Sequence, residues 1–239
     1  MTLLDDLITS IKEDANIKKI LVGAHWTVVQ SMCCGMASTV MGNKPHAVER
    51  VRDAGDLHKK SAKHLAIYAM SEYPLEACIG LAAINSLIKI DEEKLQKVNA
   101  FEVLTVKGKG KTVAVFGHFP HIDQIKSSAE RVMVFELNPT GDELRFDQVP
   151  ELLPFADVVG ITSNSIINHT LDDILAYLKP EAFSVMVGPS TPLSPVLFDR
   201  GLDMLAGVRI INPKQLFHSV GQGSVFQQVR GVELVTLSK

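Results

Sequence analysis

The feature that most constrains the fold of this chain is an alternation of short apolar runs and helical stretches that begins at residue 112. Helical patterns at 170–180 and 195–201 lie between the apolar runs. Short β-branched runs that alternate with helices are typical of a parallel sheet with helices on both faces. We therefore predict an α/β protein whose second domain, 105–239, is a Rossmann-like doubly wound parallel sheet. Its strands are expected in TVAVFG (112–117), RVMVFELNP (131–139), ADVVGITSN (156–164) and AFSVMVGPS (182–190), with one or two more in LDMLAGVRII (202–211).

Residues 1–104 have a different pattern, which predicts a small α+β domain. The apolar run at 17–31 is broken near Gly23 and predicts a β-hairpin, whereas the small, irregular residues of 32–46 predict a loop. The first 16 residues predict an amphipathic helix with an apolar stripe of Leu3, Leu4, Leu7, Ile8 and Ile11.

Three further helices are predicted before the second domain. The helix at 57–70 is expected to turn Leu57, Ala62, Leu65, Ala66 and Ala69 toward a core. Pro74 opens the next helix at a first-turn position, and the Ala and Gly residues of PLEACIGLAAINSLIKI allow close helix packing. A short helix over 91–104 follows, and VKGKGK at 106–111 is expected to link the domains.

Composition argues against two classes of partner. The 239 residues carry a net charge of -3, whereas nucleic-acid-binding domains are basic. No apolar run reaches the ~20 residues that span a bilayer, and the N-terminus lacks the regions of a signal peptide. The three cysteines, Cys33, Cys34 and Cys78, favour a reducing cytoplasm. A homodimer is the base-rate expectation for the assembly.

Polar residues follow every predicted strand of the second domain up to residue 192. In open α/β sheets, ligands bind in the crevice beyond the carboxyl ends of the strands. The convergence of these loops therefore predicts a binding site for a small molecule. The loops are GHFPH (117–121), ELNP (136–139), TSNS (162–165) with NHT (168–170), and GPSTP (188–192).

The first of these loops contains two candidate metal ligands. His118 and His121 are three residues apart on a tight bend and could share one transition metal, for which imidazole is the commonest ligand. Two histidines alone do not make a site, because catalytic metal sites use about three protein ligands. The alternative is a pair of loop histidines that bond to backbone or water.

Three further groups of residues are candidates for other chemistries. Glu136 lies 19 residues after Gly117, near where a dinucleotide-binding fold places its ribose-binding acid, but GHFPHI lacks the glycines of GxGxxG. GPSTP could bind an anion through the backbone N–H groups of Ser190 and Thr191, or could be a proline-stiffened loop. The adjacent cysteines at 33–34 could be thiol ligands, although small free cysteines more often pack in a core.

Taken in order, several stretches resemble one prokaryotic family, known as "putative heavy-metal chelation" proteins. They are VGAHWTVVQS, LAIYAMSEYPLEACIGLAAINS, VAVFGHFPHI, VFELNPTGDEL, LLPFADVVGITSNSIINHT and VGPSTPLSPVLFDRG. The resemblance implies an enolase-N-terminal-like domain, a Rossmann-like domain and a site between them. One departure is that Ser163–Ser165 replaces a Gly-Thr-Thr-like segment, which removes the backbone freedom of glycine. The ligand-binding residues implied by the matched motifs are Gly117, His118, Phe119, Pro120, Glu136, Asn138, Asn168, Gly188, Pro189, Ser190 and Thr191.

Two functions follow from these observations. The first is the binding or chelation of a heavy metal or metal-chelate, with a divalent transition metal held by His118, Glu136 and His121. The alternative is a metal-independent enzyme for a small anionic metabolite, with the anion at Ser190 and Thr191. A third hypothesis, an interaction module with a relic pocket, ranks below both. The sequence alone leaves open whether the chain is an enzyme.

Overall fold

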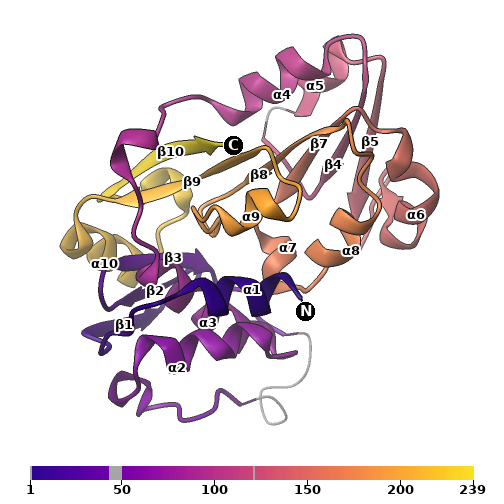
Figure 1. Ribbon diagram of the computed structural model, residues 1–239. Coiled ribbons are helices and arrows are strands. Elements are labelled where there is room, and N and C mark those ends of the chain that lie inside the picture. The colour runs from indigo at the N-terminus through magenta and orange to yellow at the C-terminus, as the bar shows by residue number, and fades with distance from the viewer. Residues whose placement is uncertain (1, 43–49, 121) are drawn as a thin grey trace.

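The computed structural model describes residues 2–42, 50–120 and 122–239, and consists of a small N-terminal unit and a larger sheet domain (Figure 1). His121, one of the predicted metal ligands, lies outside the described residues. Within the described ranges, no helix combines the length and the apolar character that crossing a membrane requires. The predicted α/β class is confirmed, since a small antiparallel sheet precedes a larger and mostly parallel one.

The N-terminal unit is a three-stranded antiparallel meander covered by helices. Its elements are α1 (Leu3–Ser10), β1 (Lys19–Val22), β2 (Trp26–Gln30), β3 (Cys34–Ser38), α2 (Ala62–Ala66) and α3 (Pro74–Leu87). The predicted amphipathic helix is α1, which Thr2 caps by accepting a hydrogen bond from the Asp5 backbone N–H at 3.2 Å. The predicted hairpin is the antiparallel pair β1 and β2.

The strand β3 lies where the sequence predicted a loop, so that prediction is wrong for Cys34–Ser38. β3 pairs with β2 and packs against α3. A Cβ atom added at Gly35 would lie 2.2 Å from the Ala82 carbonyl oxygen and 2.3 Å from the Ser86 nitrogen. Small residues are therefore needed where strand and helix meet, and they carry none of the β-branched signal by which strands are recognised.

The predicted helix at 57–70 is interrupted. 3₁₀ turns at Leu57–Lys59 and Ile67–Met70 flank the short α2. The interruption arises because Ser61 forms a β-bridge with Asn16 and then caps α2, its hydroxyl accepting from the His64 backbone N–H. The residues predicted to face the core are nevertheless all buried: Leu57, Ala62, Leu65, Ala66 and Ala69.

An ion pair ties α3 to the chain before α2. The Glu76 side chain is 4% exposed and accepts hydrogen bonds from the Arg52 backbone N–H at 2.6 Å and from Nε at 2.9 Å. Burial alone would raise the pKa of Glu76, but the hydrogen bonds from Arg52 outweigh it and hold the pKa below its usual value. The ionised carboxylate therefore stabilises the folded state.

We expect Glu76→Gln to lower the free energy of unfolding by about 1–2 kcal/mol at pH 7, because the amide cannot accept all the bonds from Arg52. The figure is modest since the guanidinium is 56% exposed. The contribution of Glu76 is fully present above its unfolded pKa of about 4.3 and is lost as the pH falls through the lower folded pKa. Urea unfolding curves should show that the difference in unfolding free energy between wild type and Glu76→Gln narrows as the pH falls below about 4.3. A difference that stays constant with pH would contradict the role of the ionised Glu76 carboxylate.

The large domain is built on a seven-stranded sheet of order β10-β9-β8-β7-β4-β5-β6. Its strands are β4 (Thr112–Phe116), β5 (Arg131–Glu136), β6 (Leu144–Arg145), β7 (Val158–Thr162), β8 (Phe183–Val187), β9 (Met204–Ile210) and β10 (Val232–Ser238). All neighbours are parallel except β10, which runs antiparallel to β9. The sheet grows in one direction from β4 to β6 and in the other from β7 to β10, so the order reverses between β4 and β7.

Helices cover both faces of this sheet (Figure 1). The helices are α4 (Ala100–Gly108), α5 (Ile122–Ser128), α6 (Val149–Leu152), α7 (Asn164–Ile167), α8 (Leu171–Ala176), α9 (Val196–Asp199) and α10 (Pro213–Gly221). Leu104 of α4 and Ile125 of α5 pack on one face with Val113 and Val115, whereas α6 to α9 share a core with the opposite face. α10 packs against the N-terminal meander through Leu216 and its neighbours.

Helix α4 belongs with the large sheet, since it contacts β7 and β8. Asn99 caps it by accepting a hydrogen bond from the Phe101 backbone N–H at 3.0 Å. The helix predicted at 91–104 is therefore shifted, and only a 3₁₀ turn at Glu92–Lys94 precedes the cap. The predicted domain boundary at 104/105 falls inside α4, and the predicted linker 106–111 includes its last turn.

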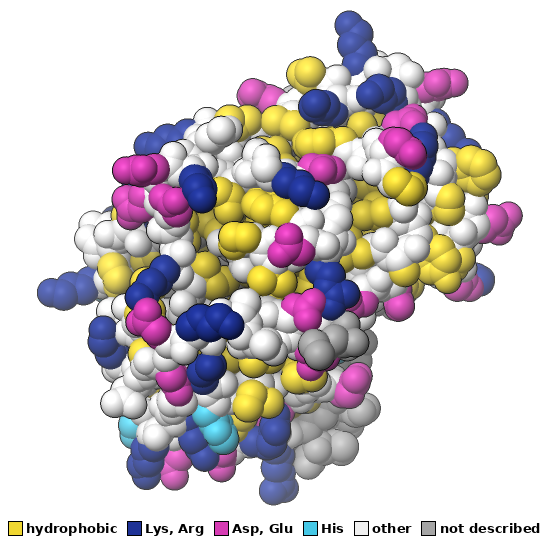
Figure 2. All heavy atoms as spheres, viewed as in Figure 1, with side chains coloured by type: hydrophobic (Ala, Val, Ile, Leu, Met, Phe, Trp, Pro, Cys, Tyr) yellow, Lys and Arg dark blue, Asp and Glu magenta, His cyan; other side chains and the backbone are white. Residues whose placement is uncertain are grey.

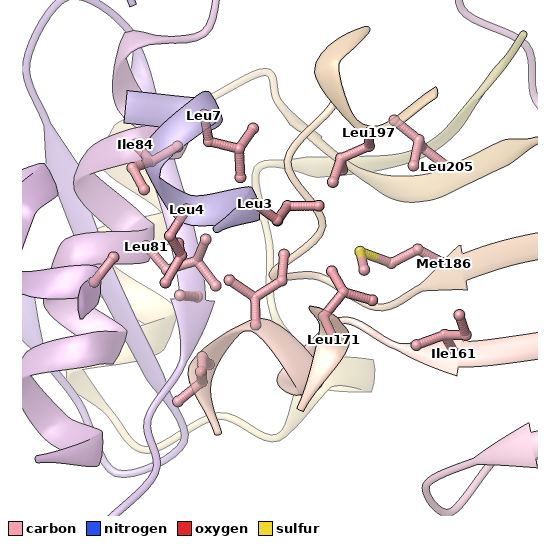
Figure 3. Close-up of a cluster of buried hydrophobic side chains, with 14 of the residues drawn as sticks. Leu3, Leu4, Leu7, Leu81, Ile84, Ile161, Leu171, Met186, Leu197 and Leu205 are labelled. Carbon is pink, nitrogen blue, oxygen red and sulfur yellow. The ribbon is translucent and has the colours of Figure 1, made fainter. Parts of the chain in front are cut away.

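One apolar core joins the two parts of the molecule. Figure 3 shows Leu3, Leu4 and Leu7 of α1 lying between α3 and the large sheet. The residues labelled in Figure 3 on the two sides of α1 are Leu81 and Ile84 from α3, and Ile161, Leu171, Met186, Leu197 and Leu205 from the large domain.

On the surface, Figure 2 shows basic and acidic side chains interspersed over the visible face, with hydrophobic side chains between them.

Candidate metal centre

A cavity of about 310 Å³ lies beside the ends of β4, β5 and β7, where the strand order of the sheet reverses. Gly117 and His118 follow β4, Glu136 ends β5, and Asn164 and Asn168 come from the segment after β7. Such a reversal is the place where open α/β sheets bind ligands. Three of the four predicted loops therefore line one cavity.

Gly117 allows the turn that places His118 at the strand end. Its φ of 97° lies in a region that side-chain-bearing residues rarely adopt. A Cβ atom at this position would also lie 3.0 Å from the Cβ of Thr162 on the neighbouring strand. The glycine predicted for this site is thus explained by backbone geometry.

The imidazole of His118 lies between two carboxylates. Its Nδ1 is 2.5 Å from Oε1 of Glu136, and its Nε2 is 2.8 Å from Oε1 of Glu143. The histidine side chain is 72% exposed, whereas Glu136 and Glu143 are 17% and 16% exposed. The carboxylates are therefore held within the protein, and the histidine covers them on the solvent side.

Glu143 was not predicted from the sequence. It directly precedes β6, whose pairing sets Arg145 beside Glu136 and so returns the chain to the end of β5. The Thr140 backbone N–H donates to Oε2 of Glu143 at 2.7 Å, and this bond is the main reason that the pKa of Glu143 is held below its usual value. A two-residue strand leaves no periodic signal. The turn-like TGDEL stretch was the one sequence hint of a returning chain.

Of the two glutamates, Glu136 has the surroundings that are less favourable for a negative charge. Burial raises its pKa; His118 partly offsets this, and the nearby Glu143 carboxylate raises the pKa further. Oε1 of Glu136 is buried and has no hydrogen-bond partner among the described residues, since its close contact with His118 lacks hydrogen-bond geometry. A bound cation would relieve both the burial of this oxygen and the repulsion between the carboxylates.

These three residues fit a divalent metal ion. His118, Glu136 and Glu143 each offer one ligand atom, and the three atoms lie within 4.8 Å of one another. Within the described part of the chain, no other group of three His, Cys, Asp or Glu residues meets this spacing. Three protein ligands with an open position are typical of catalytic metal sites, and mixed imidazole and carboxylate donors suit borderline ions such as Zn²⁺, Mn²⁺ or Fe²⁺.

Other residues predicted for these loops have different contacts. Phe119 is buried in the core under α4, with its ring centroid 5.5 Å from that of Phe101. Asn138 is exposed. Oδ1 of Asn168 accepts hydrogen bonds from the backbone N–H and hydroxyl of Thr170 at 3.2 and 2.7 Å, so its carbonyl is used at the start of α8.

The fourth predicted loop joins the two parts of the molecule. Oγ of Ser190 accepts a hydrogen bond from the Ser38 backbone N–H at 2.8 Å, and the Ser190 carbonyl accepts from Asn85 at 3.0 Å. The Thr191 backbone N–H donates to the Gly188 carbonyl at 3.0 Å, and α9 begins only at Val196. Of the two N–H groups predicted to bind an anion, that of Thr191 is therefore engaged within the loop, and the loop does not open a helix.

A larger crevice of about 720 Å³ lies next to the metal-ligand cluster, between the N-terminal unit and the large sheet. His118 lines both the crevice and the smaller cavity. Gly188 and Pro189 line the crevice with Pro120, and Trp26 comes from the N-terminal unit. The predicted loops thus divide between two adjoining spaces that share His118.

Comparison with known families identifies the chain. Residues 99–237 match the DUF364 family and residues 4–88 match the DUF4213 family, both described as "putative heavy-metal chelation". The chain belongs to the DUF364 family. The resemblance seen in the sequence motifs is thereby confirmed, and the DUF364 match includes His118, Glu136 and Glu143.

Two solved DUF364 structures have the same overall fold. A protein of unknown function from Desulfitobacterium hafniense is 27% identical, with a TM-score of 0.86 over 99% of this chain and 98% of that chain. One from Pyrococcus horikoshii is 21% identical, with a TM-score of 0.79 over the same shares. An uncharacterized protein of Methanocaldococcus jannaschii is 30% identical over 149 residues, which are 58% of this chain and 56% of that relative. The chain thus spans little more than half of that curated relative.

Proposed function

We propose that this protein binds a divalent transition metal through His118, Glu136 and Glu143, and that the adjoining crevice holds the organic part of a metal chelate. The observation that carries the proposal is the three ligand atoms within 4.8 Å of one another, two of them from glutamates that are largely buried. The family description, which names heavy-metal chelation, supports the same reading.

The donor set narrows the choice of metal. Carboxylate and imidazole ligands favour borderline and harder divalent ions, whereas soft heavy metals prefer thiolates. Cys33, Cys34 and Cys78 are free thiols, and none belongs to the ligand cluster. We therefore expect Zn²⁺, Mn²⁺, Fe²⁺, Co²⁺ or Ni²⁺ to bind at this site more tightly than Cd²⁺ or Hg²⁺.

The crevice suits a ligand with an apolar body. Its walls include Trp26, whose ring lies edge-on to Phe226 with centroids 5.6 Å apart, and also Phe101 and Phe119. The Trp26 indole N–H donates to the Ser224 carbonyl at 3.0 Å, so the ring is fixed in place. An organic chelator lying against these rings would reach the metal at His118, which lines the same space.

Several finer assignments form part of the proposal. The three-stranded meander followed by helices supports an enolase-N-terminal-like unit, and the strand order counted from β4, 3-2-1-4-5-6, is that of a Rossmann-like doubly wound sheet. We place the boundary between the two units near Asn99, just before α4. The free thiols favour a cytoplasmic location, and a homodimer is the assembly we expect.

The alternative, a metal-independent enzyme for an anionic metabolite, has less support. Its anion was assigned to the backbone at Ser190 and Thr191, and the Thr191 N–H already donates to Gly188. The metal proposal does not require a free backbone N–H at Ser190 or Thr191. No observation on the described residues favours the alternative over it.

Thermal unfolding with added metals tests the proposal. At a free metal concentration 100 times Kd, binding should stabilise the chelator-treated protein by about 2.7 kcal/mol, which corresponds to a rise in Tm of roughly 5–10 °C for a chain of this size. Zn²⁺, Mn²⁺, Fe²⁺, Co²⁺ and Ni²⁺ should be compared with Cd²⁺ at matched concentrations. The absence of stabilisation by all five ions would exclude tight binding to the native fold.

A further inference from the structure

A second cavity lies between the N-terminal unit and the large domain. This seam cavity has a volume of about 160 Å³ and is lined by β3, the chain after α3, the loop after β8, and β9. Pro189 lines both the seam cavity and the crevice. Since one water takes about 30 Å³ of the liquid, the seam cavity has room for several waters or one small organic molecule.

Three residues that line the seam cavity each have a buried polar atom without a protein partner among the described residues. These atoms are Oγ1 of Thr191, Oδ1 of Asn85 and Nε of Arg209. Thr191 as a whole is only 4% exposed. Buried polar groups in native proteins nearly always have a hydrogen-bond partner, because an unpartnered one is costly. Three such atoms around one cavity indicate that it is built for a polar occupant.

The remaining bonds of these side chains define what each atom can do. The Asn85 Nδ2 group donates to the carbonyls of Met36 at 2.9 Å and Ser190 at 3.0 Å, which leaves Oδ1 as a free acceptor. The two terminal nitrogens of Arg209 each lie 2.8 Å from a carboxylate oxygen, one of Glu92 and one of Glu233. Nε–H is a buried donor of Arg209 that no protein group among the described residues accepts. The Thr191 hydroxyl can donate or accept.

The local charge balance favours a neutral ligand. Arg209 and Lys97 are paired with Glu92 and Glu233, so the formal charges of this cluster cancel. Glu92 itself lines the seam cavity, where it would repel an anion. Burial raises the pKa of the Cys34 thiol on the same wall to about 12, so this thiol is uncharged.

We propose that the seam cavity binds a small neutral molecule that carries a carbonyl oxygen and an N–H group, such as an amide. The carbonyl accepts hydrogen bonds from Arg209 Nε–H and the Thr191 hydroxyl, and the N–H donates to Asn85 Oδ1. The aliphatic part of the ligand packs against the apolar side chains of the cavity: Ile88, Ile90, Leu193, Val208 and Ile210. The site contains none of the proposed metal ligands and is independent of the proposed function.

Acetamide and its isosteric anion, acetate, test the proposal on chelator-treated protein. Crystals soaked in acetamide should show the molecule in the seam cavity with the bonds given above, and crystals soaked in acetate at the same concentration should not. In solution, Thr191→Val should weaken acetamide binding, measured by NMR titration, by about 2- to 10-fold, the loss of one hydrogen bond. Arg209→Lys, which retains the charge but lacks Nε–H, should weaken it similarly and serves if Thr191→Val does not fold.

The matched control is Thr105→Val, whose hydroxyl donates to the Phe101 carbonyl within α4, away from the seam cavity. This control should leave acetamide binding unchanged. The proposed site would be refuted if the soaked crystals showed only ordered waters in the seam cavity. It would also be refuted if wild type, Thr191→Val and Arg209→Lys bound acetamide equally. Equal binding of acetate would overturn the neutral class of ligand. Because the protein is free of metal throughout, none of these outcomes depends on the metal centre.

Discussion

Replacing Glu136 with glutamine is expected to lower the affinity for the best-bound divalent metal by about 100-fold or more. Loss of a group that merely supports a metal ligand typically costs 10- to 100-fold, and Glu136 would be a ligand itself. Glutamine keeps the size of the side chain but removes its charge, so the change acts on the metal and spares the packing around β5. Calorimetric titration of chelator-treated protein with the metal measures the effect.

His118→Ala and Glu143→Gln should lower the affinity in the same way if all three residues bind the ion. The outcomes separate the roles of the three side chains. Unchanged affinity in Glu143→Gln, with losses in the other two variants, would reduce the protein's share of the site to two ligands. Unchanged affinity in both Glu136→Gln and His118→Ala would refute the metal centre.

The controls use residues of the same type outside the cluster. His218 is exposed on α10 and Glu151 is exposed on α6. His218→Ala and Glu151→Gln should therefore bind the metal as tightly as wild type. A loss in these variants would show that the titration reports unspecific binding to surface groups.

The part of the metal centre that the sequence predicted is the part that follows directly from strand ends. His118 and Glu136 terminate neighbouring parallel strands, and the carboxyl ends of such strands lie at one edge of a sheet. Glu143 depends instead on the pairing of β6 with β5, which fixes where a loop of irregular residues returns. That register is set by tertiary contacts and leaves no pattern in the chain.

The same distinction applies to the fold. The strands β4, β5, β7, β8 and β9 carry long apolar runs and were predicted, whereas β10 was not, because a pattern of alternating strands and helices leads one to expect parallel strands only. Contacts between the two units were also beyond prediction. The hydroxyl oxygen of Ser190 accepts a hydrogen bond from the Ser38 backbone N–H of β3, and that contact exists only once both units have packed together.

Replacing Gly80 of α3 is expected to have a large effect on the stability of the fold. The sequence predicted that the small residues of this helix permit close packing, and a Cβ atom added at Gly80 would lie 1.8 Å from the Ala69 nitrogen and 2.5 Å from the Tyr68 carbonyl carbon. Both are backbone atoms, so no side-chain rotation can relieve the clash. We expect Gly80→Ala to lower the free energy of unfolding by about 3 kcal/mol or more, at or above the top of the range for overpacked cores.

For a chain of this length, that loss corresponds to a fall in Tm of roughly 6–12 °C, which differential scanning calorimetry measures. Gly221→Ala is the matched control, since Gly221 is also a helical glycine, the last residue of α10. The nearest atom to its added Cβ is Leu21 Cδ2 at 3.7 Å, an ordinary contact. There the helix preference of alanine should leave the stability unchanged or raise it by up to about 1 kcal/mol. Equal Tm values for the two variants would mean that α3 and the 3₁₀ turn at Ile67–Met70 do not approach each other as closely as this packing requires.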